Sequence, residues 1–313
     1  MPLTNEQARQ LIDIGHVHAA QRTAQHEFIR NYRYSARWRQ IAGREYFYIG
    51  EQSRGPRGPE SEAACTAYIE AREGLQSRLE KLQTRLEDMA PVNRALRLGR
   101  VPKLPARILR ALDAEGLLGR QLRVIGTHAL FAYEIAAGEF FQADLLATTD
   151  LDLCWDAKER LTILAEDGSA RTVLSILKRV DRSFDTGKLY GMSAANDENF
   201  IVDVISPRQE DCSPATGIAG DIASAPIPEV EALTGEAFSA MAIGEDGLPV
   251  QIVCPLPDAF VDHKRTIAVA SGRPAIQRQR DAAQAVAVAA VARVLNATGN
   301  LYREASTATV PKL

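Results

Sequence analysis

The sequence predicts an α+β protein with an α/β-like core. Apolar, strand-like segments alternate with helical segments between residues 105 and 208, a pattern typical of a sheet covered by helices. A helix and an arginine-rich β-hairpin precede this region, and a largely helical region follows it. We therefore expect a short mixed sheet, with an N-terminal helix and hairpin region and a C-terminal helical region around it.

Composition sets the broad class of protein. The chain has 313 residues, is 46% hydrophobic and 25% charged, and carries a formal net charge of −3. These values are ordinary for a soluble globular protein and give no global basicity that would indicate nucleic acid. The four cysteines are isolated, which disfavours a disulfide framework or a zinc knuckle. With no signal-peptide pattern and no apolar run of about 20 residues, we expect a soluble cytoplasmic protein.

Residues 1–104 are expected to form an N-terminal region of helices and one hairpin. Thr4 and Gln7 have the spacing of a capping box, which predicts a helix to about residue 31. Aromatic and β-branched residues around Ala42-Gly43 predict a hairpin over residues 36–51. The segment SRGPRGPES that follows is expected to break the strand pattern.

A long helix is expected next, because apolar residues recur at alternating spacings of four and three. These residues are Leu75, Leu79, Leu82, Leu86 and Met89. Such a stripe favours a helix that packs on its own domain. Pro91 is expected to end it, and GRVPKLP, residues 99–105, is expected to be a linker.

Residues 105–208 are expected to form the core and residues 209–313 to complete its cleft. The core pattern comprises a helix over 107–115, the strand LRVIG, the helix THALFAYEIAAG, a strand containing DLD, the helix ARTVLSILKRV, and a hairpin from KLYGMSAAN into NFIVDVIS. The last region contains a weaker strand pair near AMAIGEDGLPVQIV and a helical tail from Asp258 onward.

Three aspartates lie inside apolar strands. Asp150 and Asp152 occur in ATTDLDLCWD, and strand alternation turns both carboxylates to one face. Asp203 lies in NFIVDVIS between apolar neighbours. Like charges on a half-buried strand cost free energy unless a positive group lies between them. Mg²⁺ prefers such oxygen ligands, and two ions about 3.5–4 Å apart can hold the attacking and leaving oxygens of a nucleotidyl transfer.

A phosphate-binding turn is predicted just upstream. In VIGTHAL, Gly126 allows the backbone to approach a phosphate, and Thr127 offers a hydroxyl at a helix start. Thr127 alone is more often a helix cap, and it can serve both purposes. The strand, Gly-Thr turn and helix are followed by a strand with a DxD pair. Together, these two features form a more specific pattern than the turn or the DxD pair alone.

This pattern resembles the polymerase-β-type nucleotidyltransferase superfamily, and more closely a bacterial family of predicted nucleotidyltransferases with a Gly-Thr/Ser, TDxDL and VDxI pattern. The resemblance is strongest over residues 124–155 and 199–207. It implies that Gly126 and Thr127 hold the triphosphate, that Asp150 and Asp152 bind both metal ions, and that Asp203 completes the second metal site and helps to activate the acceptor hydroxyl. The longer gap before Asp150 implies an insert, residues 139–149, that folds back over the site.

The resemblance extends to a helical segment near the C-terminus. Lys264 in DHKR and Asp281 in RQRD match that segment. There a lysine would neutralise a phosphate, and an aspartate would orient the lysine. The alternative is that both are ordinary surface helix residues.

Other interpretations of the acids remain open. A DxD pair also occurs in haloacid-dehalogenase-type proteins, although it normally opens the domain there. The aspartates can also be solvent-facing strand residues. An HxH pair, His16 and His18, is a weak metal candidate, because residues two apart do not share a helix face.

The hairpin interleaves basic and aromatic side chains, a pattern that can bind single-stranded nucleic acid by phosphate pairing and base stacking. Its members are Arg30, Arg33, Arg37, Arg39, Arg44, Arg54, Arg57, Tyr32, Tyr34, Trp38, Tyr46 and Tyr48. The alternative is that the aromatics form a small core and the arginines a solvated face paired with Glu45 and Glu51.

The sequence thus predicts a Mg²⁺-dependent nucleotidyltransferase, with Mn²⁺ as an alternative ion and an NTP as substrate. It would move a nucleoside monophosphate to a hydroxyl and release pyrophosphate. RNA and protein are the expected macromolecular acceptors, and a small molecule is a third. The alternative function is a binding or toxin–antitoxin regulatory module with little turnover.

Overall fold

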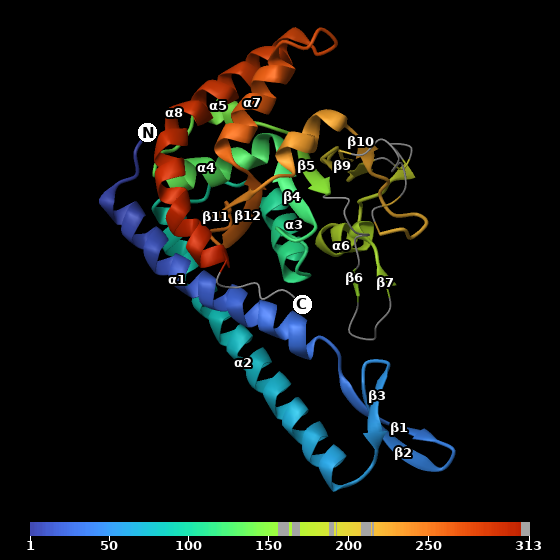
Figure 1. Cartoon of the computed structure of the whole chain (residues 1–313). Coiled ribbons are helices and arrows are strands. Elements are labelled where there is room, and N and C mark those ends of the chain that lie inside the picture. The colour runs from blue at the N-terminus through green and yellow to red at the C-terminus, as the bar shows by residue number, and fades with distance from the viewer. Residues whose placement is uncertain are drawn as a thin grey trace.

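The structure is a computed structural model that describes residues 1–155, 163–164, 170–187, 191, 193–207, 214 and 216–307. It confirms the predicted fold class, because a small mixed sheet lies among helices that precede and follow it (Figure 1). A long helical arm extends from this body and carries a separate three-stranded sheet at its far end (Figure 1).

The arm consists of two antiparallel helices and a sheet. Helix α1 (Asn5–Glu27) begins at the predicted Thr4–Gln7 capping box and continues as the π-helix η1 (Phe28–Tyr32). Strands β1 (Ala36–Ile41) and β2 (Arg44–Ile49) form the predicted hairpin. Helix α2 (Pro59–Ala95) then returns alongside α1 to the body (Figure 1).

Two predictions for the arm are wrong. The segment expected to break the strand pattern contributes strand β3 (Gln52–Pro56), which pairs with β2 at the sheet edge, where glycine and proline are tolerated. Helix α2 continues past Pro91 to Ala95. Its last turn is held by tertiary contacts, since the buried Asn93 amide donates to the Gly247 carbonyl at 2.7 Å and accepts from Gln10 at 2.8 Å.

The expected linker, residues 99–105, is a packed connection instead. The backbone N–H groups of Arg100 and Val101 both donate to the Ile243 carbonyl, at 2.9 and 3.0 Å. Gly99 has no room for a side chain, because a Cβ there would lie 2.7 Å from the Gly244 carbonyl oxygen. Helix α3 (Lys103–Ala114) begins within the segment.

The central sheet has the strand order β10-β9-β5-β4, with β8 pairing on β9. Its strands are β4 (Leu122–Ile125), β5 (Asp150–Trp155), β8 (Ser193–Ala195), β9 (Ile201–Ser206) and β10 (Ala225–Pro226). β5 runs parallel to β9 and antiparallel to β4, and β8 and β9 pair as the predicted hairpin. The sheet is therefore mixed, as expected.

Helices and two smaller sheets surround these strands. The 3₁₀ turn η2 (Gly126–Ala129) leads into α4 (Leu130–Ala137), and α5 (Ala143–Leu146) precedes β5. β6 (Ile163–Leu164) and β7 (Ala170–Arg171) lead to α6 (Val173–Val180). After the 3₁₀ helix η4 (Pro228–Leu233), β11 (Ala237–Ile243) and β12 (Pro249–Pro255) form the predicted strand pair. Helices α7 (Pro257–Ala268) and α8 (Ala275–Thr307) complete the chain's helical tail.

The two faces of the central sheet differ in character. Leu151, Leu153 and Val204 point into the main hydrophobic core, which continues into β11, β12, α7 and α8. On the opposite face, Cys154 and Ile205 belong to a small apolar cluster under η4. The aspartates share this second face, at the end where β5 begins.

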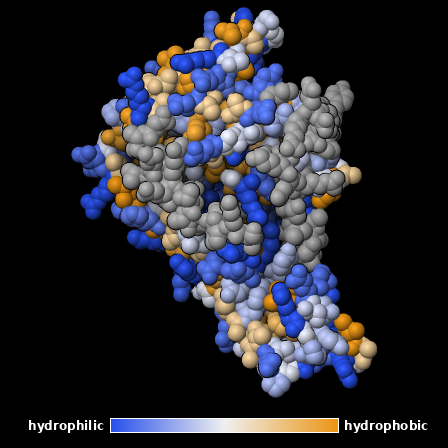
Figure 2. Space-filling model, in the orientation of Figure 1, coloured by the Kyte–Doolittle hydropathy of each residue, from blue (hydrophilic) through white to orange (hydrophobic). Residues whose placement is uncertain are grey.

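The surface is mainly hydrophilic on the face that Figure 2 shows, with apolar residues scattered over it. Among the helices the structure describes, none combines the length and apolar character needed to cross a bilayer.

Candidate active site

The three aspartates lie on one face of two adjacent strands. Asp152 and Asp203 are direct register partners across the parallel β5–β9 pair, and Asp150 lies two residues before Asp152 on the same face. Hydroxyl groups hold the outer two, since Thr148 donates to Asp150 and Ser193 donates to Asp203. All three are partly buried rather than fully solvated.

The Gly126-Thr127 turn lies directly against the acids. Gly126 follows the residue that pairs with Asp152, and its φ of +66° is in the left-handed region. A Cβ at Gly126 would overlap the Oδ2 carboxylate oxygen of Asp152. Glycine at this position therefore allows the turn and the carboxylate to share the same space.

Helices α7 and α8 bring cations to the acidic face. The Lys264 ammonium is buried and donates to Asp281 Oδ1 at 2.7 Å, while Arg273 Nε donates to Asp281 Oδ2 at 2.5 Å. Lys264 and Arg273 both lower the pKa of Asp152. The structure thus brings together the two helical residues that the sequence singled out, Lys264 and Asp281.

Two further residues of α8 hold the turn and were missed by sequence reasoning. Arg280 Nη2 donates to Thr127 Oγ1 at 2.6 Å, and Gln284 Nε2 lies 3.2 Å from the same oxygen. A separation of more than 150 residues hides this contact in the sequence. The available signal was the segment RQRD itself, in which Arg280 directly precedes Asp281.

The insert, residues 139–149, also reaches this region. The Leu145 carbonyl accepts a hydrogen bond from Gln284 Nε2 at 2.8 Å, and Thr148 holds Asp150 as described above. Gln284 therefore connects the insert to Thr127.

The electrostatics show a face with excess negative charge. Burial, followed by the charges of Asp150 and Asp203, raises the pKa of Asp152 to about 7. Burial also raises the pKa of Asp203. The hydrogen bond from Ser193 lowers this pKa, and the charge of Asp150 raises it further. Four carboxylates, those of the three aspartates and of Asp281, face three cations, Lys264, Arg273 and Arg280, so one negative charge is in excess among the described residues of the site.

His128, one residue after the turn, is buried beside the acids. Burial lowers its pKa to about 4, with opposing effects from Asp150 and Arg280, so the imidazole is neutral at pH 7. The ring makes a hydrogen bond to the backbone of Asp150. In the described part of the chain, His128 Nε2 and Gln284 Oε1 are buried without a hydrogen-bond partner.

The donor set suits Mg²⁺. Carboxylate oxygens are the ligands that this ion prefers, and it usually takes one or two carboxylates together with substrate phosphates and water. The raised pKa of Asp152 indicates that the site favours added positive charge. The unpartnered atoms His128 Nε2 and Gln284 Oε1, beside Thr127, indicate that it favours added polar groups. Within the described ranges, no group of three His, Cys, Asp or Glu side chains is arranged so that it could hold a metal ion.

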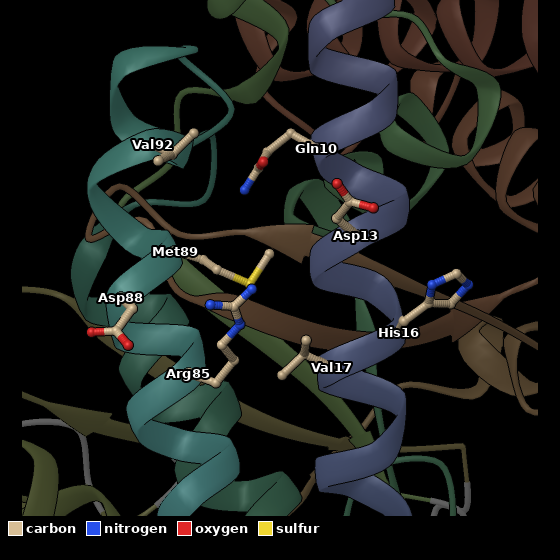
Figure 3. Close-up of a pocket in the computed structure, with 8 residues that line it drawn as sticks. All are labelled: Gln10, Asp13, His16, Val17, Arg85, Asp88, Met89 and Val92. Atoms are coloured by element: carbon tan, nitrogen blue, oxygen red, sulfur yellow. The ribbon is translucent and has the colours of Figure 1, made fainter.

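A hollow lies away from this site, between α1 and α2 of the arm (Figure 3). Its volume is about 530 Å³. It is lined by Gln10, Asp13, His16, Val17, Arg85, Asp88, Met89 and Val92. Arg85 and Met89 point into the gap between the helices, and His16 lies at its outer edge (Figure 3). This hollow shares no element with the aspartates, and His18 is buried separately.

Comparison with known proteins agrees with this geometry. A family model described as a nucleotidyltransferase matches residues 103–308, which is more than half of the chain and includes the turn, the three aspartates and helices α7 and α8. No curated protein and no solved structure matches the chain significantly. The family match favours the nucleotidyltransferase interpretation of the DxD strand over the dehalogenase alternative, and the chain belongs to this nucleotidyltransferase family.

Proposed function

We propose that the chain is a Mg²⁺-dependent nucleotidyltransferase that transfers a nucleoside monophosphate from an NTP to a hydroxyl acceptor. The observation that supports this most strongly is the placement of three aspartates on one sheet face against a Gly-Thr turn. Family membership supports nucleotidyl transfer in general.

In this proposal each group of residues has a separate task. The Gly126-Thr127 turn and Arg280 bind the triphosphate, and Lys264 contributes positive charge from the adjacent helix. Asp150 and Asp152 would hold two Mg²⁺ ions, and Asp203 would complete the second site. The bound ions supply neutralisation of the phosphate charge that develops during transfer.

The reaction breaks one P–O bond and forms another. The acceptor oxygen attacks the α-phosphorus, and the bond from that phosphorus to the bridging oxygen breaks, so that pyrophosphate leaves with the electron pair. The proton of the acceptor hydroxyl goes to the Asp203 carboxylate. The position of Asp203 beside Asp152, on the same face of the sheet, supports this role.

The test compares the fate of two labels. Purified protein is incubated with Mg²⁺, a cell extract and each NTP, labelled either at the α- or at the γ-phosphate. We expect a macromolecule to take up the α-label only, and Asp152→Asn to reduce the rate by at least about 100-fold. Uptake of the γ-label would identify phosphoryl transfer and contradict the proposal. NTP binding without any transfer would favour a regulatory module with little turnover.

A further inference from the structure

Just after η1, where the chain continues toward the distal sheet, the arm contacts the body at a cluster of arginines that share one carboxylate. Arg33 of the arm lies 2.8 Å from Glu115 Oε2, while Arg179 of α6 and Arg171 of β7 lie 2.6 and 3.3 Å from Glu115 Oε1. The Glu115 side chain is only 11% exposed and is enclosed by these three groups. We call Arg33, Arg171, Arg179 and Glu115 the junction cluster.

The junction cluster carries uncompensated positive charge. Three guanidinium groups face one carboxylate, which leaves two charges in excess within the part of the chain that the structure describes. Segments 28–33 and 171–182 together contain six Arg or Lys residues and one acid, Asp181. The Asp181 carboxylate is itself occupied by Ser183 and Asn196.

The distal sheet is different, because its arginines are largely neutralised. Residues 36–62 contain five arginines and four glutamates. Arg37 and Arg39 pair with Glu51, and Arg57 pairs with Glu45 and Glu62. Stacking against the sheet's aromatic rings occupies two of the same guanidinium groups, those of Arg39 and Arg57. The excess positive charge of this region therefore lies at the junction rather than at the hairpin.

We propose that the junction cluster binds the phosphodiester backbone of a single-stranded nucleic acid, which is the acceptor of the reaction; this rests on the proposed function. Arg171 and Arg179 are the accessible members, with 35% and 51% of their side chains exposed. An arginine that shares its acceptor with other groups keeps further N–H donors for a ligand. The planar guanidinium group also matches the geometry of a phosphate. The cluster joins three separate elements, which suits an extended polyanion better than a small anion.

The test measures binding of a fluorescein-labelled, 20-nucleotide single-stranded RNA to the full chain by anisotropy, without NTP. The junction variant is Arg171→Ala with Arg179→Ala, which leaves the Arg33–Glu115 pair intact. The matched control is Arg39→Ala with Arg57→Ala in the distal sheet. We expect the Kd to rise at least about 10-fold for the junction variant and less than about 2-fold for the control. Loss of two phosphate contacts should reduce the salt slope by about 1.4.

A second variant separates binding from structure. Glu115→Gln removes the shared negative charge, so RNA should bind more tightly while the thermal midpoint falls. A purely structural cluster predicts no gain in RNA affinity from Glu115→Gln and no selective loss in the junction variant. Equal losses in the junction and control variants, or failure of the wild type to bind RNA while it labels a protein, would overturn the inference.

The same samples distinguish the two proposals. Stabilisation by NTP and Mg²⁺ should be unchanged in the junction variant, because within the described residues Arg171 and Arg179 pair with Glu115 rather than with the aspartate site. RNA binding without nucleotidyl transfer would contradict the proposed function alone. Transfer that is insensitive to the junction variant would contradict this inference alone.

Discussion

The position of Gly126 imposes two requirements that only glycine meets together. Its backbone is left-handed, and its missing side chain leaves room for the Asp152 carboxylate. Gly138 is a matched control, because it has a similar φ of +69° with nothing near its absent Cβ.

Gly126→Ala should therefore cost more than backbone strain. We expect Gly138→Ala to lower the free energy of unfolding by about 1 kcal/mol and to leave transfer nearly unchanged. Gly126→Ala should have a larger effect on stability and should abolish transfer, because Asp152 must move. Thermal unfolding and the α-label assay measure both effects, and equal behaviour of the two variants would contradict this explanation of the turn.

Asp152 should make stability depend on pH in the metal-free protein. Its pKa rises from the ordinary 3.8 to about 7 in the folded state, so the folded state binds more protons between these values. The contribution of Asp152 to the free energy of unfolding should therefore fall as pH rises from about 4 to about 7 and then level off, whereas His128, with its lowered pKa, contributes in the opposite direction.

Asp152→Asn should remove this dependence, so that the variant gains stability relative to the wild type from pH 4 to pH 7. The exposed Asp88→Asn on α2 serves as the matched control and should follow the wild type. Thermal midpoints in the presence of a chelator test the prediction. A wild type that becomes more stable than Asp152→Asn above pH 7 would show that the carboxylate is satisfied by an internal donor.

Helices α7 and α8 are joined by a buried ion pair beside the site. Lys264 and Asp281 are only 6% and 4% exposed, so removal of one partner leaves a buried charge. Asp281→Asn should lower the free energy of unfolding by about 3–5 kcal/mol. Adding Lys264→Met should recover much of that loss without restoring NTP binding, as denaturant unfolding and nucleotide titration would show. Recovery of both properties would assign the pair to structure alone.

Element boundaries show where sequence reasoning succeeds and where it fails. The capping box, the hairpin and the strand pair β11–β12 follow from local patterns and are confirmed. The prediction that the helix ends at Pro91 is wrong because Asn93, in the last turn of α2, is held by Gln10 and Gly247. Both residues are distant from it in sequence. The edge strand β3 was missed because its glycine and proline suit only an edge, and a sequence does not reveal which strand is outermost.

The same distinction applies to the candidate site. Strand alternation and the Gly-Thr turn identified Gly126, Thr127, Asp150, Asp152 and Asp203 as candidates from local spacing alone. The register that pairs Asp152 with Asp203 depends on a parallel strand pairing that no local pattern encodes. Arg280 and Gln284 reach Thr127 only through the packing of α8, so their contacts appear only in the folded chain.

At the scale of the whole molecule, the arm carries a distal sheet that is separate from the sheet of the body. Strands β1, β2 and β3 pack on α2, far from the body (Figure 1). The base of the arm, in contrast, is integral to the fold. Ile14 and Leu86 are buried with Leu98, Phe140 and Ile243, so deletion of the whole N-terminal region would expose an apolar cluster.

A smaller deletion tests the role of the distal sheet. Residues 36–56 are replaced by a flexible glycine–serine linker, which keeps α1, Arg33 and α2 in place. We expect stabilisation by NTP and Mg²⁺ to be unchanged, and most RNA affinity to remain, because the junction cluster is intact. Loss of RNA binding with full nucleotide binding would instead place the acceptor on the hairpin.

The central claim is that the aspartate face accepts metal-bound triphosphate, and thermal unfolding with and without Mg²⁺ plus NTP tests it most directly. Because a ligand that binds only the folded state stabilises it by mass action, the wild-type midpoint should rise as the NTP concentration increases. Asp152→Asn should be at least as stable as the wild type without ligand at pH 8, and should show little or no rise when Mg²⁺ and NTP are added. An equal rise in both proteins, or an Asp152→Asn variant that is unfolded without ligand, would contradict the account.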